Sequence, residues 1–134
     1  MRARLTALKR RLSQRGAFLL LLAVFDLVYA SGLAWAPAET RATPTYVFLA
    51  SLLPLGAWAV VWAVVGLLCL VQAWTAQDRF AYTAATALKI LWALLHLGAW
   101  AFDVLLRGYI SAAIWLLAAG AVMIMASVAK GGVR

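Results

Sequence analysis

Hydrophobic residues in this chain fall into four long blocks, which are separated by short and more polar segments. The blocks cover residues 17–36, 46–71, 80–102 and 109–129 and contain almost no charge. The hydrocarbon core of a bilayer is about 30 Å thick, and roughly 20 apolar residues in a helix cross it. The pattern therefore predicts an all-α integral membrane protein whose four transmembrane helices form an up-down bundle. The connections are too short for a soluble domain, so we expect residues 17–129 to form one transmembrane domain.

A basic segment precedes the first block. Within residues 2–15, Leu5, Leu8 and Leu12 follow a helical spacing, and basic residues stand between them. The spacing predicts a short amphipathic helix, within a cytoplasmic segment 1–16, that lies on the anionic inner leaflet. The alternative is a charged tail that only sets the topology. The basic residues assigned to the membrane surface are Arg2, Arg4, Lys9, Arg10, Arg11 and Arg15, and Gly16 is the candidate hinge into the first span.

Positive charge is distributed unevenly between the two ends of the predicted bundle. One end has Arg79, the basic N-terminal segment and a short basic tail at 130–134, whereas the other end has only Arg41 and Arg107. Because cytoplasmic loops are enriched in Lys and Arg, we expect both termini to be cytoplasmic and the protein to lie in a bacterial inner membrane. This topology accounts for the formal net charge of +8, so nucleic acid is not expected as a partner.

A cleaved signal peptide is the alternative interpretation of the first block. Its basic start and apolar run fit, and cleavage would follow Ala30. Asp26 interrupts the apolar stretch, however, and this favours a retained transmembrane helix.

Two features of the predicted spans concern the end of the bundle opposite the termini. Pro54 lies within the second block and removes a backbone hydrogen bond, so we expect a kink near Leu53. Asp103 and Arg107 are four residues apart beside the last turn, and this spacing predicts a solvated interfacial ion pair.

Three ionisable residues stand inside the predicted spans, namely Asp26, Lys89 and His96. An ionised side chain at the centre of a membrane helix costs about 2.5–3.5 kcal/mol. Asp26 and Lys89 each lie nine residues beyond the start of their blocks, in helices that run in the same direction, so the two side chains should share a depth and form an ion pair. Alternatively, Lys89 extends to the inner interface. The seven-residue spacing of Lys89, His96 and Asp103 places them on one helical face as a polar stripe, which suits either a wet path or an oligomer interface. The structural alternative is an interhelical ion pair together with one hydrogen-bonded histidine.

The polar residues do not make a catalytic or metal-binding set. One histidine, one cysteine and few carboxylates cannot supply an ordinary metal site, and no nucleophile has a base beside it. We therefore expect neither an enzyme nor a cofactor.

Three short segments resemble a known group of membrane proteins. They are TRATPTY at 40–46, LPLGAW at 53–58 and RGYISA at 107–112. With the four spans, they are similar to small membrane proteins encoded by phages and prophages of actinobacteria. Some proteins of this group are proposed to be holins, which accumulate in the inner membrane and then open holes that start host lysis. The resemblance implies a bilayer-embedded oligomer and supplies no catalytic residues.

Three functional hypotheses follow. The first is a holin-like, membrane-permeabilising homo-oligomer. The second is an accessory subunit, scaffold or superinfection-exclusion factor that packs on a membrane partner protein. The third is a small proton-coupled transporter, because one carboxylate in the first of four spans is similar in outline to the small multidrug-resistance exporters. The residues on which these hypotheses depend are Asp26, Lys89 and His96.

Overall fold

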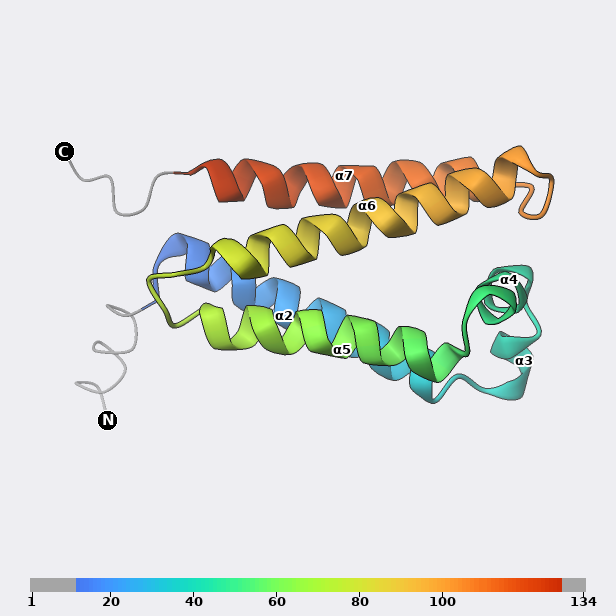
Figure 1. Ribbon diagram of the computed structural model, residues 1–134, viewed down its shortest axis with the longest axis horizontal. Coiled ribbons are helices and arrows are strands. Elements are labelled where there is room, and N and C mark those ends of the chain that lie inside the picture. The colour runs from blue at the N-terminus through green and yellow to red at the C-terminus, as the bar shows by residue number, and fades with distance from the viewer. Residues whose placement is uncertain (1–11, 129–134) are drawn as a thin grey trace.

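The computed structural model describes residues 12–128, and four long helices dominate it. They are α2 (Gln14–Ala34), α5 (Leu55–Gln72), α6 (Arg79–Ala101) and α7 (Gly108–Ser127). Successive long helices run in opposite directions, which confirms the predicted all-α, up-down bundle (Figure 1). Each of the four is long and apolar enough to cross a membrane. The protein is thus a multi-pass membrane protein, and its helices contact the lipid bilayer.

The first span begins earlier than the sequence pattern predicts. Ser13 adopts an extended conformation, and its hydroxyl accepts a hydrogen bond of 3.0 Å from the backbone N–H of Gly16. This is an N-cap, so α2 starts at Gln14 and already contains Arg15. Gly16 is therefore a residue of the helix rather than a hinge. The remaining part of the predicted amphipathic helix, with Arg2, Arg4, Lys9, Arg10 and Arg11, and the tail 130–134 lie outside the described residues.

The second span is interrupted rather than kinked. The helix α4 (Pro44–Leu52) ends before Leu53, whose extended backbone has φ −147° and ψ 150°, and α5 begins directly after Pro54. The proline ring disfavours helical geometry in the residue before it, and proline donates no hydrogen bond, so a complete break results. The membrane-crossing helix is consequently α5 alone, in place of the predicted 46–71. Figure 1 shows α4 crossing the end of the bundle, beside the short helix α3 (Ala38–Arg41).

An indole side chain stabilises this break. Trp58, in the first turn of α5, donates a hydrogen bond of 3.0 Å from its ring N–H to the backbone carbonyl of Leu49 in α4. The same carbonyl also accepts a hydrogen bond of 3.2 Å from the backbone N–H of Leu53, so the indole is a second donor at the end of α4. Trp58 and Leu49 are both buried, and their contact attaches α4 to the bundle.

The long helices form two halves. Packing is most extensive between α2 and α5 and between α6 and α7, and less extensive between these two pairs. We call the zone between the α2–α5 half and the α6–α7 half the seam. Glycines permit close approach within each half: a Cβ at Gly66 would contact Leu27 of α2, and one at Gly108 would overlap the carbonyl oxygen of His96.

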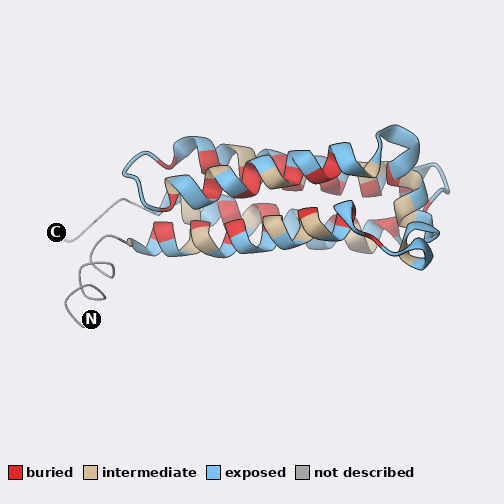
Figure 2. Cartoon of the chain, turned by 90° about the horizontal axis from the view of Figure 1, so that it is seen from below, coloured by how far each residue is buried: buried red, intermediate tan, exposed pale blue. Residues whose placement is uncertain are grey.

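The outside of the bundle is apolar. Buried residues follow the inward faces of the helices, and exposed residues cover the outward faces (Figure 2). Large hydrophobic side chains are strongly exposed along the spans, including Val28, Val60, Leu94 and Leu117. In water such a surface would cause aggregation, but in a bilayer it contacts lipid chains.

Candidate functional site

The seam contains the ion pair that the sequence predicts. Lys89 of α6 and Asp26 of α2 meet with their Nζ and Oδ1 atoms 2.8 Å apart. Their side chains are only 2% and 0% exposed, respectively. Because the pair joins α2 to α6, it connects the two halves of the bundle. Lys89 therefore does not extend to the membrane interface.

Two aromatic rings lie close to the ammonium group of Lys89. Its Nζ atom lies 5.3 Å from the ring centroid of Trp62 and 5.8 Å from that of Phe25. The negative faces of aromatic rings attract a cation, and the attraction strengthens where water is excluded. Trp62 comes from α5 and Phe25 from α2, so both rings belong to the half opposite Lys89.

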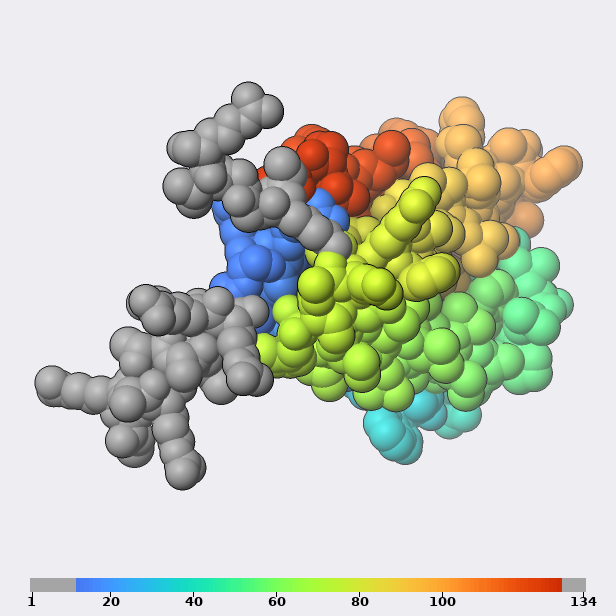
Figure 3. Space-filling view, turned by 60° about the vertical axis from the view of Figure 1, so that its left-hand side comes forward, coloured from blue at the N-terminus to red at the C-terminus, as the bar shows by residue number. Residues whose placement is uncertain are grey.

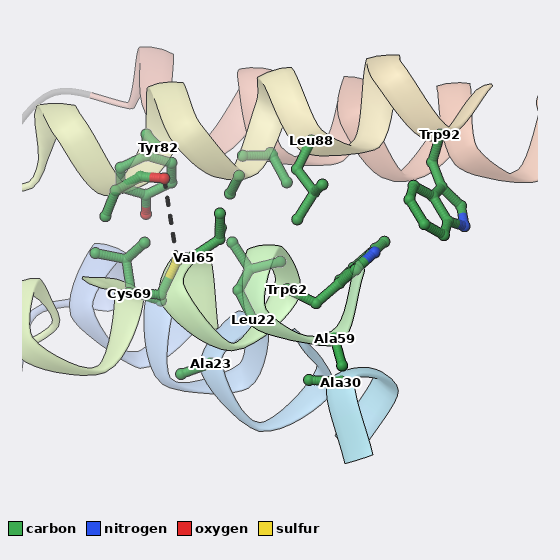
Figure 4. Packing of buried hydrophobic residues seen from close by; sticks show 14 of the residues in the cluster. Leu22, Ala23, Ala30, Ala59, Trp62, Val65, Cys69, Tyr82, Leu88 and Trp92 are labelled. Carbon is green, nitrogen blue, oxygen red and sulfur yellow. Dashed lines mark hydrogen bonds between the residues drawn. The ribbon is translucent and has the colours of Figure 1, made fainter. Parts of the chain in front are cut away.

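The rings belong to a larger aromatic cluster, which we define as Phe25, Tyr29, Trp62, Trp92 and Trp115. Trp62 and Trp92 project from α5 and α6 into the space between them (Figure 4), and their ring centroids are 5.1 Å apart in an edge-to-face arrangement. Tyr29 lies 4.3 Å from Trp62, and its hydroxyl accepts a hydrogen bond of 2.9 Å from the indole N–H of Trp92. The cluster thus spans the seam at the level of the ion pair.

Tyr29 was not singled out from the sequence as a residue of this cluster. Its position four residues after Phe25, on either side of Asp26, puts both rings on one face of α2, and this spacing was the available signal.

Two buried polar atoms in this region have no hydrogen-bond partner among the described residues. They are Oδ2 of Asp26 and Nε1 of Trp62. Buried polar atoms are almost always hydrogen-bonded, so each such exception calls for an explanation. One atom is an acceptor and the other a donor, and both belong to residues that contact Lys89.

His96 is buried but does not extend the polar stripe to Asp103. Its Nδ1 atom lies 2.7 Å from the backbone carbonyl of Trp92, one turn earlier in α6. Asp103 lies beyond the end of α6 and is exposed. The structure therefore brings Lys89 to Asp26 and leaves His96 in a local contact. Within residues 12–128 there is no group of three His, Cys, Asp or Glu side chains that could hold a metal ion.

The prediction that Asp103 and Arg107 form an ion pair is wrong. The two side chains are not within ion-pair distance, because Asp103 is not helical: it has φ 57° and follows the helix end. The N–H of Asp103 bonds to the carbonyl of Trp100 at 3.0 Å, and the N–H of Val104 bonds to that of Ala99 at 2.8 Å. This is a Schellman motif with aspartate in the left-handed position, so the four-residue helical spacing does not apply.

The assignment of Arg15 to the membrane surface is also wrong. The side chain is 10% exposed and forms a bidentate pair with Asp78, through Nε at 2.9 Å and Nη2 at 3.0 Å. Its Nη1 atom donates to the carbonyl oxygens of Ala126 at 2.7 Å and Val128 at 2.6 Å, at the end of α7. Asp78 precedes α6, so Arg15 crosses the seam and neutralises partial charge at a helix C-terminus.

We expect Arg15→Lys to loosen the end of α7. Lysine cannot form the bidentate pair and also reach the carbonyls, so the last turn of α7 should lose about 1–3 kcal/mol of local stability. Hydrogen–deuterium exchange of the amides in 122–128 measures this as faster exchange. The exposed neighbour Arg79, changed to lysine, is the matched control and should leave the rate unchanged. Equal exchange in both variants would contradict the role assigned to Arg15.

Together, the fold and the seam define a four-span helical membrane protein with a charge pair buried between two helical halves. The chain matches no family model, no curated protein and no solved structure in comparisons with known proteins.

Proposed function

We propose that the protein is a holin-like, membrane-permeabilising oligomer that accumulates as a closed bundle and opens at its seam. One observation carries this proposal: the ion pairs of Asp26 with Lys89 and of Arg15 with Asp78 both cross the seam. In the closed bundle these charges are neutralised inside, and the outside is apolar. Such a molecule can accumulate in lipid without disturbing the barrier.

Opening of the seam would reverse this arrangement. Each half would then present a charged and aromatic face, and the cost of exposing one such charge to hydrocarbon is about 2.5–3.5 kcal/mol. Several copies could avoid that cost by turning the polar faces toward a shared water-filled lumen. The transition would therefore depend on protein density in the membrane, as holin action requires. The small size, the four spans and the resemblance to actinophage membrane proteins support the same proposal.

The test is controlled expression in a bacterial host with membrane potential as the readout. The native chain should cause an abrupt collapse of the potential once enough protein is in the membrane. The variant Asp26→Leu/Lys89→Leu replaces the pair by apolar side chains, which frequently preserves stability. This variant should accumulate in the membrane to the same amount as the native chain. It should not collapse the membrane potential, because its open halves would lack a polar lining.

The matched control carries Glu39→Gln and Arg41→Gln, which remove two exposed charges of α3. It should act like the native chain. An unchanged potential with the native protein confirmed in the membrane would refute permeabilisation. A single membrane protein that co-purifies in fixed ratio would then favour the accessory role.

A second candidate function is transport of a small cation coupled to protons. Two observations support it. Oδ2 of Asp26 and the indole N–H of Trp62 have no hydrogen-bond partner among the described residues, and the ammonium of Lys89 lies 5.3 Å from the ring centroid of Trp62. A substrate cation could replace the ammonium at the carboxylate. Uptake of ethidium into proteoliposomes under a pH gradient tests this, and Asp26→Asn should abolish it. Absence of uptake by the native protein would reject this candidate.

A further inference from the structure

A groove opens at the end of the bundle where α2 and α6 begin and α7 ends; Figure 3 views the molecule from the side of that end. Its volume is about 640 Å³, and it lies along α6 with contributions from Arg15 and Ala126. Most of the lining comes from the first three turns of α6, which contribute Arg79, Thr83, Thr86, Ala87 and Ile90. The groove is distinct from the buried centre around Asp26.

The lining changes from charged to apolar along the helix. Arg79 is the first residue of α6, the hydroxyls of Thr83 and Thr86 follow one and two turns later, and Ala87 and Ile90 complete the inner part. At 1.5 Å per residue, Arg79 and Ile90 are about 16 Å apart along the axis. This distance covers the depth from a lipid headgroup to the upper part of its acyl chain.

The charges of the groove favour an anion at its rim. Arg79 is exposed, and its guanidinium forms no ion pair or side-chain hydrogen bond with another residue of the described part of the chain. The Asp78 carboxylate also lines the groove, but Arg15 binds both of its oxygens. The local field at the rim is therefore set by Arg79.

We infer that this groove binds one phospholipid with an anionic headgroup. The phosphate would lie against the Arg79 guanidinium, within reach of the Thr83 hydroxyl, and an acyl chain would follow Ala87 and Ile90. A cation at the membrane interface attracts an anionic headgroup, and the apolar inner part selects a lipid over a soluble phosphate. This inference is independent of the proposed permeabilising function.

Native mass spectrometry of the full chain tests the inference. The protein would be extracted from nanodiscs that contain equal amounts of phosphatidylglycerol and phosphatidylcholine. We expect one phosphatidylglycerol to be retained per chain, and glycerol phosphate at the same concentration should not displace it. Arg79→Gln should lower retention about fivefold, since one basic residue near the surface contributes on that order. Ala87→Phe, which narrows the apolar part, should also lower retention.

Arg41→Gln is the control, because Arg41 is exposed at the other end of the bundle. It should retain the lipid as the native chain does. Equal retention of both lipids, displacement by glycerol phosphate, or the same loss in Arg41→Gln and Arg79→Gln would each overturn the inference.

Discussion

Replacing Lys89 by methionine should destabilise the folded protein by about 3–5 kcal/mol, the usual cost of leaving one partner of a buried ion pair alone. Methionine has nearly the length of lysine, so packing changes little while the charge is lost. Asp26, whose side chain is 0% exposed, would then lose the counter-charge that lies 2.8 Å away. The free energy of unfolding in lipid–detergent micelles, obtained by denaturant titration, measures the effect.

The double variant Lys89→Met/Asp26→Leu separates the charge effect from packing. It removes both charges, and replacing a buried pair by apolar residues is commonly neutral or stabilising. We therefore expect its unfolding free energy to return to within about 1.5 kcal/mol of the native value. If the single variant were as stable as the native chain, or the double variant less stable than the single, the pair would not hold the seam as the geometry implies.

Trp62→Ala should be the most costly change at a single aromatic side chain. Trp62 is fully buried and contacts rings from α2, α6 and α7, so its removal leaves a cavity in the centre of the bundle. Truncation of a buried tryptophan to alanine costs about 3–5 kcal/mol in protein cores. Inside a membrane this loss is chiefly one of packing contacts, because lipid chains are as apolar as the core. The same unfolding titration is the measurement.

Two further variants give this prediction its controls. Trp35→Ala removes an indole that is 80% exposed and should change stability by less than about 0.5 kcal/mol. Trp62→Phe retains a large ring and removes the N–H that has no partner in the described structure, so it should be far less damaging than alanine. A cost for Trp62→Phe as large as that for Trp62→Ala would show that the indole N–H binds something at the seam.

The interruption at Pro54 shows which part of a helix break can be predicted from the sequence and which part cannot. The sequence indicates that proline disturbs the second span, because the missing N–H and the steric effect on Leu53 are local properties. Whether the helix bends or ends also depends on the tertiary contacts of the segments on either side of the proline. One such contact is the hydrogen bond from the indole of Trp58 to the carbonyl of Leu49, and it exists only in the folded structure.

The buried position of Arg15, in contrast, could not be predicted from the sequence. In the sequence it is one of several basic residues before an apolar block, and all of them fit a membrane surface equally well. Its burial follows from the convergence of three distant elements: the start of α2, the residue before α6 and the end of α7. Hydropathy carries no information about that convergence. Asp78 was missed for the same reason, since a lone carboxylate in a loop is ordinarily solvated.

The sequence by itself determined the number of apolar spans, their alternating directions and the matching positions of Asp26 and Lys89 along two parallel helices. These features depend on helical rise and on the exclusion of charge from hydrocarbon, which are local or one-dimensional quantities. Only the tertiary structure decided that Lys89 pairs with Asp26 rather than extending to the interface, that rings from α2 and α5 lie beside its ammonium, and that Arg15 turns inward. Those outcomes depend on the rotation of each helix about its axis and on which helices touch, and both are set by close packing between side chains distant in the sequence.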